Sequence, residues 1–135
     1  GMKHLTIILA FLIPLSTQVN AEEKYWDLYD KCTSRCEATY SANSTCTVGI
    51  CSGEIKEIAT SRITFLVTQL ETVIDDFKLE TLYDSQESWQ NYMENHCNLM
   101  GIYDGSPMFS YCPMELSIER AEELEILLKS SQIGF

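Results

Sequence analysis

Six cysteines behind an apolar N-terminal run constrain this 135-residue chain more than any other feature. The run Leu5–Leu15 follows Lys3 and precedes Val19-Asn20-Ala21, an order typical of a secretory signal peptide cut after Ala21. A permanent membrane anchor needs roughly 20 apolar residues, and this run is shorter. The sequence therefore predicts a signal peptide over 1–21 and an exported chain over 22–135, periplasmic or secreted, with no membrane association after cleavage.

Export to an oxidising compartment predicts that the cysteines form disulfide bonds. Cys32 and Cys36 lie one turn apart on a helical face, and Cys46 and Cys51 follow a short polar loop where the chain can reverse. If the chain reverses there, its geometry favours the nested pairs Cys32–Cys51 and Cys36–Cys46. A rival arrangement that contains Cys36–Cys51 stays open, because sequence alone does not settle connectivity.

The last two cysteines, Cys97 and Cys112, flank a second loop and are expected to pair with each other. The chain has no C-x-x-C motif, and His96 is the only histidine of the predicted mature chain. A zinc site would require a more compact Cys/His set, so we expect neither a metal nor another cofactor.

Helical periodicity predicts an all-α fold: a single small disulfide-braced bundle of about four helices. Within this bundle the apolar stripes of the second and third helices place Phe77 and Trp89 in the core. Ser52 is expected to cap the second helix, which runs to about Lys78, with an uncertain break between Asp75 and Thr81. The helices are expected over 22–40, 52–78, 79–97 and 114–130, with loops over 41–53 and 101–113.

The charge balance narrows the function. The chain carries 9 Lys+Arg against 20 Asp+Glu, a net charge of -11, which argues against a nucleic-acid partner and favours a basic protein. No G-x-S-x-G motif or other catalytic constellation is present, so we do not expect an enzyme. Asn43-Ser44-Thr45 matches a glycosylation sequon, a three-residue pattern that often arises by chance.

The second half of the chain resembles the lysozyme inhibitor LprI-like family. The spacing L-x-x-x-Q-x-x-W-x-x-Y-x-x-x-x-C is carried by Leu82, Gln86, Trp89, Tyr92 and Cys97. Gly-Ser, Tyr-Cys, Arg and Leu follow in family order as Gly105-Ser106, Tyr111-Cys112, Arg120 and Leu124. The first half departs from the family: residues 44–51 differ from its usual motif, and an additional cysteine pair is present.

The resemblance implies an exported bacterial binding protein, with lysozyme inhibition described for some members. Such an inhibitor would enter a cleft lined by two carboxylates, and the loop between Cys97 and Cys112 is the best candidate for the inserted segment. We expect the partner contacts at Tyr103, Asp104, Gly105, Ser106, Phe109 and Tyr111. The competing hypothesis is a disulfide-stabilised interaction or structural module without lysozyme affinity. Whichever function holds, we expect a structural role for four of the motif residues, which hold the third helix to the fourth: Gln86, Trp89, Tyr92 and Arg120.

Overall fold

The computed structural model describes residues 21–40 and 45–133, and these residues form helices joined by short turns without a strand. The predicted all-α, disulfide-braced fold is confirmed. The predicted signal peptide, apart from Ala21, and the sequon residues Asn43 and Ser44 lie outside the described residues. The elements in chain order are α1 (Ala21–Tyr40), the π-helix η1 (Thr45–Ile50), α2 (Cys51–Glu71), α3 (Asp76–Tyr103) and α4 (Met108–Ile133).

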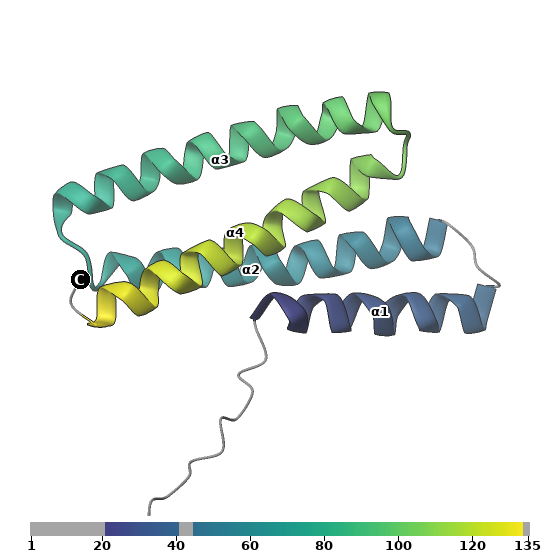
Figure 1. Ribbon diagram of the computed structural model, residues 1–135, viewed down its shortest axis with the longest axis horizontal. Helices are drawn as coiled ribbons and strands as arrows, with labels where there is room; N and C mark the ends of the chain where they lie inside the picture. Colours follow the sequence, from purple (N-terminus) through teal and green to yellow (C-terminus); the bar gives the residue numbers. More distant parts are fainter. Residues whose placement is uncertain (1–20, 41–44, 134–135) are drawn as a thin grey trace, which may run out of the picture.

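The core is built chiefly between α2 and α4, which pack against each other more extensively than any other pair (Figure 1). Their apolar residues recur every three or four positions, so one face of each helix is buried. The largest fully buried apolar side chains of this face are Ile55, Leu66, Leu70, Met114, Ile118 and Leu124. Helix α1 adds Tyr25, and α3 adds Leu82.

Helix α3 is attached to the bundle mainly through α4. In Figure 1 it lies on the opposite side of α4 from α1. Only four of its 28 residues are buried, namely Leu82, Met93, Cys97 and Gly101. Among the described helices, none has the length and apolar character needed to cross a bilayer.

The break between α2 and α3 comes earlier than predicted. Helix α2 ends at Glu71 rather than near Lys78, and Asp75 begins α3 by accepting a hydrogen bond from the Lys78 N–H at 2.9 Å. This side-chain cap satisfies a backbone donor that an uncapped helix start would leave free. As a result Phe77 leaves the buried register of α2 and is 80% exposed, so its predicted core position is wrong.

Both predicted loops are shorter in the structure. The stretch 101–113 is helical except for 104–107, where Gly105 adopts a φ of 114° that favours glycine. Pro107 stands just before α4, where its missing N–H is tolerated, and Pro113 lies inside α4. Glycine and proline were therefore poor guides to the length of this connection.

The predicted cap at Ser52 is wrong. The π-helix η1 leads directly into α2 at Cys51, so there is no free helix start for a cap to serve. Ser52 is instead fully buried in the first turn of α2, and its hydroxyl has no hydrogen-bond partner among the described residues.

Candidate functional site

The disulfides confirm the nested arrangement. Cys32 pairs with Cys51 and Cys36 with Cys46, which ties α1 to the start of α2 and to η1. The rival pairing that contains Cys36–Cys51 is therefore not the one observed. Cys97 pairs with Cys112 as predicted. Because only residues 104–107 separate α3 from α4, this bond joins the two helices near their connection.

The α3–α4 tip, defined here as residues 99–110, presents apolar side chains to solvent. Tyr103 is 78% exposed at the end of α3, and the turn 104–107 follows it. The ring of Phe109 packs on the backbone of Gly101 so closely that a Cβ at this position would clash with it. The predicted partner-binding residues Tyr103, Asp104, Ser106 and Phe109 are thus brought together at the tip, with Gly105 forming its turn.

Tyr111 does not belong to this tip. Its ring lies 6.1 Å from that of Trp26 and 6.0 Å from that of Tyr29, between α1 and α4. Burial raises the pKa of the Tyr111 hydroxyl above its usual value. Its aromatic contacts hold α1 on α4, and its predicted partner contact stays a prediction.

Arg120 joins α4 to α3 through hydrogen bonds. The guanidinium is 8% exposed and donates to Gln86 Oε1, Ser85 Oγ and Glu123 Oε2, each at 3.0 Å. A guanidinium is buried favourably only when its donors are paired in this way. The expectation that Gln86 and Arg120 connect the two helices therefore holds.

The other positions of the resemblance divide into buried and exposed residues. Leu82 and Leu124 lie in the core, and Trp89 is half-buried where the main core meets the cluster around Cys97. Tyr92 is 55% exposed and stacks on His96, with ring centroids 5.1 Å apart. Tyr92 thus does not join α3 to α4, contrary to its expected structural role.

An apolar groove that sequence reasoning missed lies at the far end of α3 from the tip. It has a volume of about 610 Å³ and runs between the α2–α3 turn, the first turns of α3 and the last turns of α4. Its apolar lining includes Val73, Ile74, Phe77, Leu82 and Leu127. Apolar periodicity predicted that Val73 and Phe77 lie on a buried helix face. The missed signal was Asp75, a residue type that commonly caps a helix and would have indicated a break between these two positions.

An acidic cluster lies where α1 meets α4. Burial raises the pKa of the Glu119 carboxyl above 4.5, and the nearby carboxylates of Glu115, Glu22 and Glu123 raise it further. The folded chain therefore holds this proton more tightly than the unfolded chain does.

Replacing Glu119 with Gln should raise the thermal midpoint at pH 7 by about 1–3 °C, a modest shift because the side chain is largely exposed. A raised pKa in the folded state means that ionisation destabilises the fold as pH rises from about 4.5 through the folded pKa. The gain of Glu119→Gln should therefore disappear at pH 4, as measured by thermal melts followed by circular dichroism. An equal gain at both pH values would contradict this explanation.

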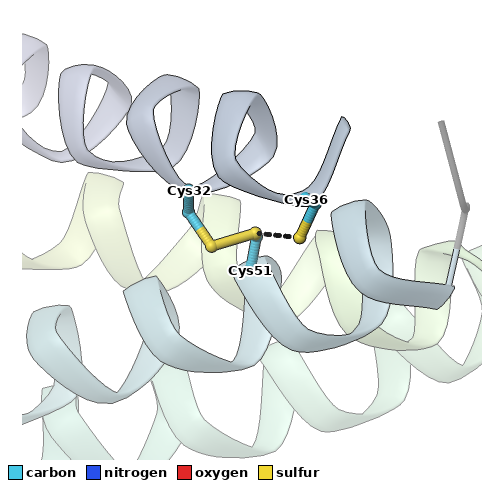
Figure 2. Close-up of side chains that lie close together, drawn as sticks. All are labelled: Cys32, Cys36 and Cys51. Carbon is cyan, nitrogen blue, oxygen red and sulfur yellow. Dashed lines mark hydrogen bonds between the residues drawn. A yellow bond between two sulfur atoms is a disulfide. The ribbon is translucent and has the colours of Figure 1, made fainter. Parts of the chain in front are cut away.

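The nested disulfides bring three sulfurs from α1 and α2 together (Figure 2). Cys36 Sγ lies 3.5 Å from Cys51 Sγ, although these two cysteines belong to different disulfides. The Sγ atoms of Cys32, Cys36 and Cys51 all lie within 4.8 Å of one another. Cys46 is bonded to Cys36, but its Sγ is not among the sulfurs that all lie within 4.8 Å of one another.

Comparison with protein-family models, curated proteins and solved structures finds no match to this chain. The resemblance of residues 82–124 to the LprI-like family therefore stays a prediction.

Proposed function

We propose that this chain is an exported binding protein that inhibits a lysozyme by placing the α3–α4 tip in the substrate cleft. The observation that carries the proposal is an exposed, nearly uncharged tip, fixed by a disulfide, on a strongly acidic molecule. Between Cys97 and Cys112 the only charged residue is Asp104. The exposed apolar side chains of the tip are Leu99, Ile102, Tyr103 and Phe109.

The distribution of charge suits a basic partner with an acidic cleft. The net charge of -11 attracts a basic protein over a Debye length of about 8–10 Å. A lysozyme cleft is lined by two carboxylates, which would repel an acidic insert. The hydroxyls of Tyr103 and Ser106 can donate hydrogen bonds to such carboxylates, so this tip is better suited to the cleft than the acidic helix faces are.

The tip is also prepared for binding by its rigidity. The Cys97–Cys112 bond, the packing of Phe109 on Gly101 and the turn at Gly105 all restrict its backbone. A segment that is already ordered loses less conformational entropy when it binds. Exposed aromatic residues on such a segment are typical anchors of protein interfaces.

The first test is a lysozyme turbidity assay with the purified exported chain. We expect inhibition of a basic c-type lysozyme that weakens from low to physiological salt. Tyr103→Ala should raise the inhibition constant roughly 30-fold, which corresponds to about 2 kcal/mol for an interface anchor. Phe77→Ala is the matched control, since Phe77 lies on the same helix with 80% exposure against 78% for Tyr103.

The apolar groove favours a second candidate, an interaction module without lysozyme affinity. Exposed Val73, Phe77 and Leu127 border a concave apolar surface, the kind of surface on which an amphipathic helix docks. Asp76, Glu80 and Asp84 each come just before a lining residue of α3, and these three carboxylates outnumber Lys78 of the lining, so they would favour a helix with basic residues. If several lysozymes are not inhibited, the inhibitor proposal fails. Loss of binding to a basic helical peptide in Phe77→Ala, with Tyr103→Ala unchanged, would then support this second function.

A further inference from the structure

We infer that the chain, once its disulfides are reduced, binds one Zn²⁺ ion through Cys32, Cys36, Cys46 and Cys51. Four thiolates form a closed, tetrahedral structural zinc site. The inference is independent of the proposed inhibition, because it concerns the α1–η1–α2 end of the chain and a different redox state. It replaces the expectation of no metal only for the reduced form.

The positions of the sulfurs support four-fold coordination. Tetrahedral thiolates at about 2.3 Å from zinc lie about 3.8 Å from one another. The Cys36 and Cys51 sulfurs are already 3.5 Å apart, and Cys32 lies within 4.8 Å of both. The two sulfurs of a disulfide start about 2 Å apart, so each reduced pair has to open by less than about 2 Å. Cys46 Sγ lies outside the group of sulfurs within 4.8 Å of one another, so its side chain also has to rotate toward Cys32 and Cys51.

Three separate segments deliver the ligands in a fixed arrangement. Cys32 and Cys36 lie one turn apart on the same face of α1. Cys46 comes from η1, and Cys51 is the first residue of α2. This set is therefore more compact in space than its spacing along the sequence indicates.

The surroundings exclude water from the sulfurs. All four cysteines are at most 8% exposed, and Tyr29 packs against their cluster. Glu54 Oε2 lies 3.7 Å from Cys32 Sγ, and this carboxylate is paired with Arg35 at 3.6 Å. The Glu54–Arg35 pair therefore brings no net charge to a centre that would itself carry about -2. Cys97 and Cys112 lie in another cluster and supply only two sulfurs.

The disulfide and zinc forms exclude each other. A phosphine reduces each disulfide to two thiols, and it is itself oxidised to the phosphine oxide with oxygen from water. Four thiols then release their protons as Zn²⁺ binds. Oxidation of the four thiolates to two disulfides removes four electrons, which a disulfide reagent accepts, and frees the metal. Zinc would accordingly hold the α1–α2 hairpin together before oxidation.

The test uses the whole exported chain, reduced by a phosphine without oxygen and titrated with Co²⁺ and then Zn²⁺. We expect one Co²⁺ per chain with the intense visible absorption of tetrahedral thiolate coordination, displaced by Zn²⁺. The oxidised chain should bind neither ion. Cys97→Ser/Cys112→Ser should keep the full signal, whereas Cys36→Ser/Cys46→Ser should lose it.

A second measurement tests whether the reduced chain loses its structure and whether Zn²⁺ restores it. Zn²⁺ should raise the helical circular dichroism and the thermal midpoint of the reduced chain, and it should do so equally in Cys97→Ser/Cys112→Ser. Absence of Co²⁺ binding to the reduced chain would overturn the inference. Equal loss of binding in both double variants would also overturn it, because binding would then involve all six thiols without a defined site.

Discussion

Replacing Cys97 and Cys112 together with alanine should lower the free energy of unfolding by about 3 kcal/mol. The two cysteines are 15 residues apart, and closing a loop of this length restricts the unfolded chain by about that amount. The bond also contributes more to holding α3 in place than it would for a well-buried helix. Only four residues of α3 are buried, and α4 is its main packing partner. We therefore expect the loss to be concentrated in α3.

Urea denaturation and native-state hydrogen exchange measure these two effects separately. The total loss is read from the denaturation midpoint, and exchange should show that the amides of α3 lose protection before those of α2 and α4. Cys36→Ala/Cys46→Ala is the control, because that pair joins α1 to η1. In the control the amides of α1 should be affected first. Unchanged protection of α3 in Cys97→Ala/Cys112→Ala would show that packing on α4 is sufficient to hold it.

The periodic features of the sequence predicted most of the fold. Apolar residues at helical spacing identified the buried stripes of α2 and α4, and the one-turn spacing of Cys32 and Cys36 led to the nested disulfides that the structure contains. The apolar pattern repeats over many residues, so a single exception does not change the result. The Cys97–Cys112 pair was equally predictable, although it joins helices and not the ends of a long loop.

Element boundaries were less predictable because a single residue can decide them. Because Asp75 caps α3, this helix starts earlier than predicted, and Phe77 is exposed where a core position was predicted. Gly101 was interpreted as part of a loop, yet it allows the Phe109 ring to pack closely on a continuous helix. Such roles depend on a partner from another segment, which sequence spacing does not reveal.

The candidate site could be predicted in part for the same reason. The Cys97–Cys112 disulfide fixes the ends of the tip, as its sequence position predicted, while the partner contacts of the tip stay a prediction. The aromatic contacts of Tyr111 could not be predicted, because its partners Trp26 and Tyr29 come from α1, far away in the sequence. The groove beside Phe77 was missed because it exists only where α2 ends and α3 begins.

Leu66→Ala should lower the free energy of unfolding by about 3–4 kcal/mol, the largest effect expected from a single substitution. Leu66 is fully buried in the central α2–α4 contact, so truncation removes buried methyl groups and leaves a cavity. The backbone cannot easily close this cavity, because both helices are long and are fixed by core residues on either side. Denaturation by urea, fitted with a common slope, measures the loss directly.

The neighbouring residue provides the matched control. Phe65 is larger than Leu66 but 48% exposed, and its ring lies 4.8 Å from the Arg62 guanidinium carbon. An exposed cation–π contact contributes about 0.5–1 kcal/mol, so Phe65→Ala should cost no more than about 1 kcal/mol. The two variants thus separate burial from side-chain size on adjacent positions of one helix. If Phe65→Ala were as damaging as Leu66→Ala, α2 would have to present its other face to the core, and the α2–α4 packing described above would be incorrect.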